Sequence, residues 1–281
     1  VLVIGGRYGL SSKDTDVAQI VAVFENLAAD QPKRGFTIGI VDDVTNLSLP
    51  VHALEDFEDS DTYSCKFWGL GGDGTVGANH NTIRILGDCA DMFAQAYFEY
   101  DSKKSFGVTK SHLRLSKKPI RSTYYVKRAD FVACHNQSYV RQYDMVQEVK
   151  PGGTFLLNTG WTPEELDANL PGAMKRYIAC NGIRLFTVDA VEIAHRVGLG
   201  SHINTVLQAA FFKISGLMPV EQALDYMKDA ARKSYARKGD AVVASNVAAI
   251  EEGAQRCVEV EVPSSWANAE LDACASDEGL P

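Results

Sequence analysis

Short apolar runs alternate along the chain with segments whose apolar residues recur every three or four positions. Residues 1–4 and 36–41 are apolar runs of strand length, and residues 17–27 between them have the spacing of an amphipathic helix. Asp16 precedes that helix, where an N-cap residue is expected. The pattern therefore predicts a β-α-β unit over residues 1–41.

An acidic stretch over residues 42–62 interrupts this alternation. It is dense in aspartate and glutamate and contains few apolar side chains that a core can bury. We expect a linker here and a domain boundary near residue 60. Residues 1–60 are then a segment of a preceding domain together with that linker.

The alternation resumes at residue 63 and predicts a larger domain over residues 61–258. Thr162 opens a sequence typical of a capping box at the start of a helix. Residues 101–120 are basic and are expected to form a loop. The spacing predicts strands at 65–68, 93–100, 123–126, 131–134, 154–158 and 183–188 and helices at 75–86, 139–149 and over most of 189–257.

This order of elements indicates the fold class. Strands that alternate with helices favour an α/β fold with a mostly parallel sheet covered on both faces. We therefore predict a three-layer, Rossmann-like α/β fold with a helical C-terminal part. Residues 259–281 are polar and are expected to begin a next domain or to form a linker.

Composition and charge narrow the possible partners. The 281 residues include 28 Lys and Arg and 36 Asp and Glu, a net charge of −8, so we expect no binding to nucleic acid or to a membrane surface. The six cysteines are widely spaced and form no Cys-x-x-Cys pair, as in reduced cytoplasmic proteins. We predict a cytoplasmic protein in which this chain binds no metal. The apolar run at its beginning, without an initiator Met, suggests a piece of something longer.

The strongest sign of a ligand is a glycine-rich turn between the strand at 65–68 and the helix at 75–86. Gly69, Gly71 and Gly74 have the G-x-G-x-x-G spacing. Glycines tolerate positive φ and let the backbone approach a ligand closely, and the amides at the helix start then bind a diphosphate. The alternative is a turn with a purely structural role.

A pair of lysines bears on the kind of ligand. Asp101 stands after the second strand, where a dinucleotide site places an acid that holds a free ribose diol. Ser102, Lys103 and Lys104 follow it at once, and two ammonium groups favour a phosphate on the ribose. The pattern thus indicates coenzyme A, with its 3′-phosphate, or NADP, with its 2′-phosphate.

Several stretches resemble sequences of the pyruvate:ferredoxin (flavodoxin) oxidoreductase family. They follow one another in the order of the family and cover nearly the whole chain. They are residues 6–14, 36–46, 72–79, 100–105, 111–114, 129–135, 153–158 and 208–213.

The resemblance implies that the chain is a fragment of such an enzyme, spanning its γ-type third domain and the flanks of that domain. These enzymes are homodimers that oxidatively decarboxylate pyruvate to acetyl-CoA and CO₂ and pass electrons to ferredoxin or flavodoxin. They use thiamine diphosphate, Mg and [4Fe–4S] clusters, all expected outside this chain. No residue of the chain is therefore predicted to be catalytic, and the fragment alone is expected to be inactive.

The resemblance also implies that this region holds coenzyme A. Three departures from the usual family sequence, at His80, Phe106 and Leu115-Ser116, put the exact loop shape in question. The residues expected to contact coenzyme A are Gly71, Gly72, Asp73, Gly74, Thr75, Val76, Asn79, Ser102, Lys103 and Lys104.

A second candidate site lies in the N-terminal turn. Ser11 and Ser12 stand at a helix entrance with Lys13 beside them, and Arg7 precedes them in the same block. These residues either bind an anion or form a solvated connection.

Two other functions remain open from the sequence. One is an NADP-binding oxidoreductase domain, since NADP carries the same kind of phosphate. The other is a non-catalytic subunit-contact module, in which the glycine turn serves only the fold.

Overall fold

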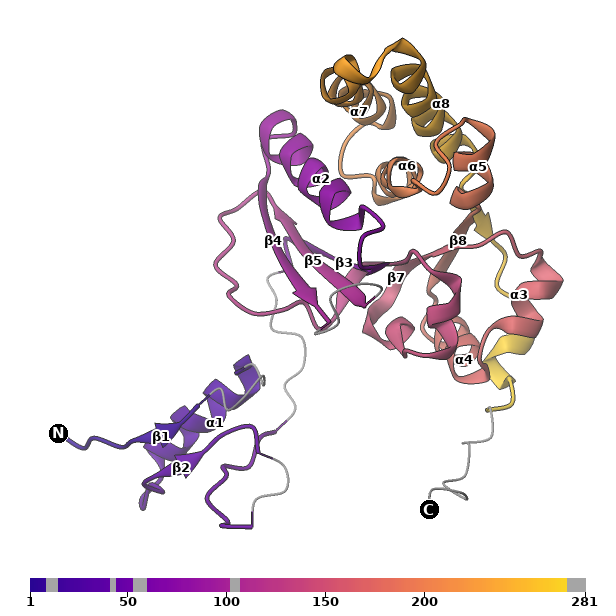
Figure 1. Ribbon diagram of the computed structural model, residues 1–281. Coiled ribbons are helices and arrows are strands. Elements are labelled where there is room, and N and C mark those ends of the chain that lie inside the picture. Colours follow the sequence, from indigo (N-terminus) through magenta and orange to yellow (C-terminus); the bar gives the residue numbers. More distant parts are fainter. Residues whose placement is uncertain (9–14, 41–43, 53–59, 102–106, 272–281) are drawn as a thin grey trace. The chain divides into compact units, whose positions relative to one another are not determined.

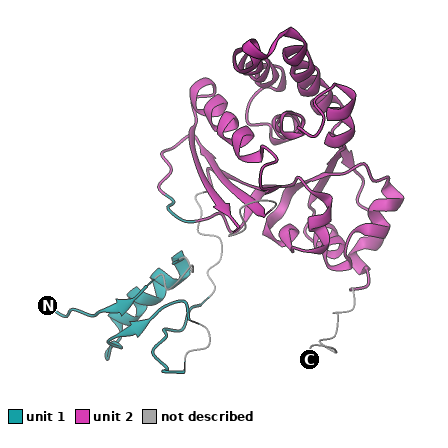
Figure 2. Cartoon of the chain, in the orientation of Figure 1, with its two compact units in different colours: residues 1–59, 122–124 teal, residues 60–121, 125–281 magenta. Residues whose placement is uncertain are grey.

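The structure is a computed structural model that describes residues 1–8, 15–40, 44–52, 60–101 and 107–271 (Figure 1). The chain forms two compact units: unit 1 comprises residues 1–59 and 122–124, and unit 2 comprises residues 60–121 and 125–281 (Figure 2). Within the described ranges, no helix has both the length and the apolar character that crossing a membrane requires.

Unit 1 contains the β-α-β unit that the sequence predicts. β1 (Gly6–Arg7) pairs in parallel with β2 (Phe36–Thr37), and α1 (Val17–Ala28) connects them. The Asp16 carboxylate caps α1 by accepting a hydrogen bond from the backbone N–H of Gln19 at 2.9 Å. The predicted N-cap is therefore confirmed.

The strands of unit 1 are shorter than the apolar runs suggest. Residues 1–4 pair with no strand in the described chain, so the prediction of a strand there is wrong. The second strand ends early because Gly39 takes a φ of +80°, outside the β region. The buried core of this unit includes Ala22, Phe36, Ile38 and Leu49.

Unit 2 is built on a seven-stranded sheet with the order β4-β5-β3-β6-β7-β8-β9. β3, β6, β7 and β8 are parallel, whereas β5 is antiparallel to β3 and β4, and β9 is antiparallel to β8. The strands are β3 (Thr62–Leu70), β4 (Phe93–Tyr100), β5 (Val108–Ser116), β6 (Ala129–Cys134), β7 (Val149–Asn158), β8 (Arg184–Val188) and β9 (Val258–Val260).

Helices cover both faces of this sheet (Figure 1). One layer contains α2 (Thr75–Cys89), α5 (Ala190–Arg196), α6 (Asn204–Ser215), α7 (Val220–Tyr235) and α8 (Asp240–Arg256). The other contains α3 (Pro163–Asn169), α4 (Gly172–Cys180) and the 3₁₀ helices η1 (Gln137–Arg141), η2 (Met145–Glu148) and η4 (Ser264–Asn268), and a further 3₁₀ helix, η3 (Ala236–Lys238), follows α7.

Alternation along the strands produces these layers. In β6, Phe131 and Ala133 pack in the core of the α2 and α6 layer, and Val132 and Cys134 pack in the core of the α3 and α4 layer. Strands buried on both faces read as continuous apolar runs, which is why β6, β7 and β8 were visible in the sequence. The predicted three-layer, mostly parallel α/β fold is confirmed.

The prediction of a loop over residues 101–120 is wrong for β5. Lys110, His112 and Arg114 alternate along this strand with inward-facing apolar residues such as Leu113. The three basic side chains occupy the opposite face of the sheet. There Lys110 Nζ binds the Glu99 carboxylate of β4 at 2.8 Å, and His112 Nε2 lies 3.4 Å from the same carboxylate. A strand with one charged face lacks the apolar run on which the prediction depended.

A second ion pair lies on the same face of the sheet and is more deeply buried. Lys66 Nζ of β3 binds the Glu148 carboxylate at 2.5 Å, and only 7% of the Lys66 side chain is exposed. The Nε1–H group of Trp68 donates to the same carboxylate at 3.0 Å. Burial lowers the pKa of Lys66, while the Glu148 carboxylate opposes that shift.

Two other predicted elements differ from the structure. Residues 123–126 form no strand. The predicted helix at 139–149 is replaced by the two short 3₁₀ helices η1 and η2. The first buries Tyr139 and Val140, and the second buries Met145 and Val146. The capping box at Thr162 is confirmed, with its hydroxyl accepting from the Glu165 N–H and the Glu165 carboxylate accepting in return.

Candidate ligand site at the glycine turn

The glycine turn lies at the carboxyl end of β3. The chain leaves β3 through α2 toward β4 on one side of the sheet, whereas β6, β7 and β8 extend on the other side. The boundary between β3 and β6 is therefore a topological switch point. Open α/β sheets bind their ligands in the crevice at such a point.

Asp73 builds the turn from within. Its Oδ2 accepts from the backbone N–H of Leu70 at 2.8 Å, and its Oδ1 accepts from the N–H of Thr75 at 2.8 Å. Gly72 and Gly74 flank it with φ values of +95° and +88°. The two glycines are needed because an L-residue with a side chain is strained at these angles. The carboxylate therefore shapes the turn and is already bound to two amides.

Several backbone amides around the turn have no partner in the described chain. Gly71 donates to the carbonyl of Gly107 at 2.7 Å, which ties the turn to β5. By contrast, no acceptor among the described residues meets the N–H groups of Gly72, Gly74 or Val76. Because these donors stand at the positive end of the α2 dipole, they are suited to an anion.

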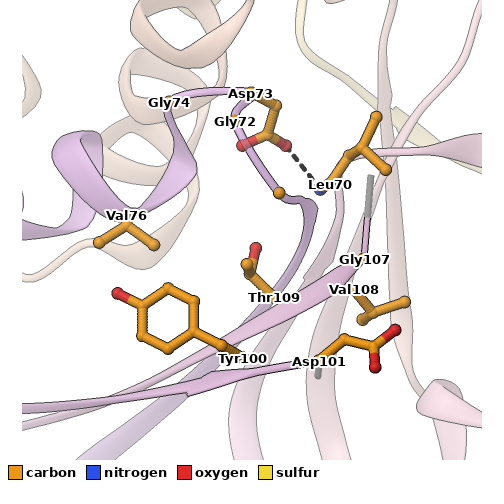
Figure 3. Close-up of a pocket in the computed structure, with 11 residues that line it drawn as sticks. Leu70, Gly72, Asp73, Gly74, Val76, Tyr100, Asp101, Gly107, Val108 and Thr109 are labelled. Atoms are coloured by element: carbon orange, nitrogen blue, oxygen red, sulfur yellow. Dashed lines mark hydrogen bonds between the residues drawn. The ribbon is translucent and has the colours of Figure 1, made fainter. Parts of the chain in front are cut away.

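A hollow of about 410 Å³ opens beside the turn. In Figure 3 the Tyr100 ring, at the end of β4, points toward Val76, whereas the Asp101 carboxylate points away from it. The lining residues are Leu70, Gly71, Gly72, Asp73, Gly74, Val76, Tyr100, Asp101, Gly107, Val108 and Thr109.

Unpaired polar side chains lie in and near this hollow. Thr109, which lines it, is buried, and its hydroxyl has no partner in the described chain. Nearby, α2 packs against β4 and β5. The Asn79 amide nitrogen of α2 and the Ser111 hydroxyl of β5 are also buried without a hydrogen-bond partner in the described chain. Buried polar atoms are normally hydrogen-bonded. The Thr109 hydroxyl is therefore available to a polar ligand in the hollow.

A buried contact holds the turn on the sheet. The Thr75 hydroxyl lies 2.7 Å from Nδ1 of His135, the first residue after β6. Burial lowers the pKa of His135, with the Asp73 carboxylate opposing the shift, so the ring is neutral at pH 7. The Asn158 amide donates to the His135 carbonyl at 2.8 Å and accepts from the Ala190 N–H at 2.9 Å. These bonds join the carboxyl ends of β3, β6 and β7 at the switch point.

The structure brings together most of the predicted turn residues. The stretch from Gly71 to Gly74 and Val76 line the hollow, whereas Thr75 faces His135 and Asn79 is buried in α2. Arg7 lies exposed at the end of β1 in unit 1. The other predicted site residues lie outside the described residues: Ser102, Lys103, Lys104, Ser11, Ser12 and Lys13.

Sequence reasoning missed the far wall of the hollow and the residue behind the turn. Val108 and Thr109 fall in the stretch that was predicted to be a loop. His135 follows directly after an apolar strand, at the same edge of the sheet as the glycine turn, and that position was the available signal. Among the described residues, no group of three or more His, Cys, Asp or Glu side chains is arranged to hold a metal ion.

Residues 64–256 match the model of the family described as pyruvate ferredoxin/flavodoxin oxidoreductase. The chain belongs to this family. It is 51% identical to pyruvate:ferredoxin oxidoreductase of Moorella thermoacetica over 276 residues, which are 98% of this chain and 24% of that protein. It is 50% identical to pyruvate-flavodoxin oxidoreductase of Enterobacter agglomerans over 281 residues, all of this chain and 24% of that protein. The chain thus spans about a quarter of the length of these family members.

Solved structures of related subunits share the fold of the chain. The pyruvate oxidoreductase subunit PORC of Thermotoga maritima aligns with a TM-score of 0.58 and 17% identity, covering 72% of this chain and all of that one. The 2-oxoglutarate:ferredoxin oxidoreductase of Magnetococcus marinus, with 2-oxoglutarate, coenzyme A and succinyl-CoA bound, aligns with a TM-score of 0.54 and 15% identity, covering 72% of this chain and 32% of that one. At these identities the likeness concerns the α/β fold alone.

Proposed function

We propose that this chain is the coenzyme A-holding part of a 2-oxoacid oxidoreductase, with pyruvate as the substrate. The reaction is the oxidative decarboxylation of pyruvate with coenzyme A to acetyl-CoA and CO₂, with two electrons passed to ferredoxin or flavodoxin. One observation carries the proposal. A hollow at the carboxyl end of β3, walled by the glycine turn and by the adjoining ends of β4 and β5, contains unpaired backbone amides at the N-terminus of α2.

The family members support the kind of reaction. The Moorella thermoacetica and Enterobacter agglomerans proteins are pyruvate:ferredoxin and pyruvate-flavodoxin oxidoreductases, and half of their residues in this region are identical to those of this chain. The Magnetococcus marinus enzyme, which shares the fold, was solved with coenzyme A bound. A phosphate-binding hollow in this chain is consistent with a coenzyme A site.

The chain's own residues hold and orient the ligand in this proposal. The amides of Gly72, Gly74 and Val76 donate to the diphosphate, and the helix dipole adds to the attraction. Asp73 keeps these amides in place without taking part in binding, because its carboxylate is already bound to two other amides. Tyr100 and Thr109 supply an aromatic surface and a hydroxyl on the opposite wall.

Lys103 and Lys104 complete the site in the proposal. They follow Asp101, which lines the hollow, within three residues of sequence. Two ammonium groups at that distance in sequence can reach the 3′-phosphate, and they offset the acidic charge of Asp73 and Asp101. The segment thereby fixes the nucleotide end of coenzyme A, so that its thiol is positioned for the reaction.

The remaining chemistry is proposed to lie in other parts of the enzyme. Thiamine diphosphate with Mg supplies the decarboxylation chemistry, and [4Fe–4S] clusters carry the electrons. The partners of this chain are then the other domains of the same polypeptide, in a homodimeric cytoplasmic enzyme. The same proposal predicts that residues 60–271 are required for acetyl transfer to coenzyme A but perform no bond-breaking step themselves.

The NADP alternative has less support from the sheet. In a dinucleotide site the acid that holds the ribose follows the strand next to the glycine-turn strand. Here β5 lies between β3 and β4, so Asp101 at the end of β4 stands two strands away from the turn. Strong binding of NADPH without binding of coenzyme A would nevertheless favour that alternative, and binding of neither would favour a subunit-contact module.

A matched pair of variants at Val76 tests the site. Val76 occupies the first turn of α2 and lines the hollow. Val76→Asp places a carboxylate where helix acids are tolerated, so folding should be retained, while repulsion of the ligand phosphates lowers coenzyme A affinity about tenfold or more. Val76→Asn introduces a side chain of the same size as aspartate but without its charge, and it is expected to lower coenzyme A affinity much less. Calorimetry on the 281-residue chain and the KM for coenzyme A in the full-length enzyme measure both.

The lysine assignment has its own test. Dephospho-CoA lacks the 3′-phosphate, so it should bind the unmodified chain more weakly than coenzyme A does. A Lys103→Ala, Lys104→Ala double variant should lose about 1.5–3 kcal/mol for each charged hydrogen bond and should no longer distinguish the two ligands. Equal affinity of the unmodified chain for both ligands would show that the lysines do not bind the 3′-phosphate.

A further inference from the structure

A second hollow lies among the helices α2, α6, α7 and α8, on the other side of the glycine turn. Its volume is about 290 Å³. Asn204 lines it and also approaches the turn, since a Cβ at Gly74 would lie 3.2 Å from the Asn204 side chain. The two hollows therefore flank the same segment of backbone, but Leu70, Tyr100 and Thr109 belong to the first hollow only.

The lining of the second hollow is polar and uncharged. No Asp, Glu, Lys or Arg is among its described lining residues. Apolar surface comes from side chains such as Met227 and Ile250. The polar lining side chains are Asn81, Asn204, Thr205, Gln208, Ser234 and Asn246.

Two buried amides on its wall retain hydrogen-bonding capacity. Gln208 is 8% exposed; its Nε2 donates to the Thr82 hydroxyl at 3.0 Å, and its Oε1 accepts from Asn81 at 3.4 Å. Asn246 is 3% exposed; its Nδ2 donates to the Val242 carbonyl at 2.8 Å, and its Oδ1 accepts from the Thr205 hydroxyl at 3.4 Å. A primary amide has two N–H donors and two acceptor lone pairs. Each side chain therefore keeps a donor and acceptor capacity beyond these bonds.

Three basic residues stand next to the last lining residues of α7 in the sequence. Lys233, Arg237 and Lys238, near the end of α7 and in η3, are exposed and form no ion pair with a described residue. Lys238 Nζ lies 5.5 Å from the centre of the Tyr235 ring, and Tyr235 lines the hollow. The nearest acid along the chain is Asp240. Three cations against one acid are conspicuous in a chain with a net charge of −8.

We propose that this second hollow binds an adenine nucleotide, with the base in the amide-lined interior and the phosphate at these basic residues. Asn and Gln amides pair with the N6 and N7 edge of adenine through one donor and one acceptor. Its volume of about 290 Å³ lies at the lower end of the range for ligand pockets, about 300–1,000 Å³, which suits a nucleoside better than a whole coenzyme A or dinucleotide. The site differs from the proposed diphosphate site in the first hollow, and its occupation does not require that proposal.

Two sources carry this chemistry: a free nucleotide such as AMP, and the nucleotide end of coenzyme A. Titration of AMP into the chain in the absence and in the presence of saturating coenzyme A distinguishes them. Displacement of AMP identifies the coenzyme A end as the occupant and overturns the assignment of its 3′-phosphate to Lys103 and Lys104, whereas simultaneous binding identifies a free nucleotide. Either result supports an adenine nucleotide in this hollow if the variants below respond as stated.

The experiment is calorimetric titration of AMP, adenosine and inorganic phosphate into the 281-residue chain and into the full-length enzyme. Ser234→Trp fills the exposed mouth of the hollow and is expected to abolish AMP binding. Arg237→Ala with Lys238→Ala removes two of these cations and is expected to weaken AMP about tenfold or more, with adenosine changed less than about twofold. Arg121→Ala, another exposed arginine that does not line the hollow, is the control and should leave all affinities unchanged.

Three results would overturn the proposal: no binding of AMP at millimolar concentration, unchanged AMP affinity in Ser234→Trp, or an equal loss for AMP and adenosine in the Arg237→Ala, Lys238→Ala variant. The Val76→Asp variant separates the two hollows. If it abolishes coenzyme A binding and leaves AMP binding intact, the sites are independent. If coenzyme A fails to bind the unmodified chain, while AMP binds it and the Ser234→Trp variant abolishes AMP binding, the proposed function fails and this inference stands.

Discussion

Substitution of Gly69 by alanine tests whether the turn is built as described. A Cβ at this position would lie 2.6 Å from the Thr75 hydroxyl and 2.9 Å from Oδ2 of Asp73, distances that real Cβ contacts essentially never show. Both neighbours are fixed by hydrogen bonds, Thr75 to His135 and Asp73 to two amides, so neither can move without losing a bond. Gly69→Ala must therefore either displace the carboxylate or push the strand and the helix apart.

The expected cost follows from these contacts. Overpacking at a buried site costs about 1–3 kcal/mol. Displacement of the Asp73 carboxylate adds about 1.5–3 kcal/mol for a lost charge-assisted hydrogen bond. We expect the free energy of unfolding of unit 2 to fall by about 2.5–6 kcal/mol. At about 2–4 °C per kcal/mol for a domain of this size, the melting temperature drops by several degrees or more.

Gly77→Ala is the matched control in the same motif. Gly77 lies inside α2, its φ is not positive, and a Cβ there meets no atom within 4 Å. Alanine is the better helix former, so this variant should be more stable than the unmodified chain by about 0.4–1 kcal/mol. Urea unfolding followed by tryptophan fluorescence measures both variants, because Trp68 of β3 is buried in unit 2. Unchanged stability of Gly69→Ala, or an equal loss in Gly77→Ala, would refute the described geometry.

Substitutions at three other contacts test the rest of the description. Glu148→Gln leaves the Lys66 ammonium buried without its counter-charge and should cost about 3–5 kcal/mol in urea unfolding. Glu148→Leu with Lys66→Met removes both charges and should cost less, about 1–3 kcal/mol, because only the Trp68 indole N–H then lacks its acceptor. Hydrogen bonds from His112 and, to a smaller extent, from Lys110 lower the pKa of Glu99 to about 2. The contribution of the ionised Glu99 to folding stability is therefore present above pH 4.5 and is lost as the pH falls toward 2. Glu99→Gln should therefore cost about 1 kcal/mol at pH 6, allowing for the partial exposure of this carboxylate, and nothing near pH 2, as measured by unfolding at a series of pH values. Thr75→Val leaves Nδ1 of His135 buried without a partner and should cost about 1–3 kcal/mol, with Thr75→Ser much closer to the unmodified chain.

The elements that the sequence predicts well are those whose pattern is set by burial on both sides. β6 and β8 are continuous apolar runs in a parallel sheet, and α7 lies within residues 189–257, most of which the spacing predicted to be helical. The Thr162 capping box is local chemistry within four residues, so nothing distant can override it. These features together were sufficient for the fold class.

The features that could not be predicted depend on partners distant in the chain. β5 carries a charged face because Glu99 of β4 and Glu148 of η2 neutralise the basic residues there and on β3. A basic strand and a basic loop have the same composition when those partners are unknown. The order of the strands, with β5 between β3 and β4, could likewise not be predicted from the sequence, although this order decides which residues form the wall of the hollow.

The candidate site was predicted on one side only. The glycine spacing located the turn because two of its three glycines meet a local steric requirement, Gly74 through positive φ and Gly69 through close contact. Gly72, which is not part of that spacing, also has a positive φ. Asp73 was included only through the family resemblance, yet the structure gives it a definite role as the internal brace of the turn. The wall formed by Thr109 was not predicted, because it depends on the pairing of β5 with two other strands.

The placement of β5 has a consequence for folding kinetics. β4 and β5 form a local antiparallel pair joined through residues 101–107, whereas β3 must join β5 and β6 across long loops. Local pairs close quickly, and non-local pairs must first meet the entropy cost of loop closure. One wall of the hollow is thus available early, and the glycine turn completes it late. A ligand that requires both walls binds only the finished sheet, and at a hundred times its dissociation constant it would stabilise that state by about 2.7 kcal/mol, mainly by slowing unfolding.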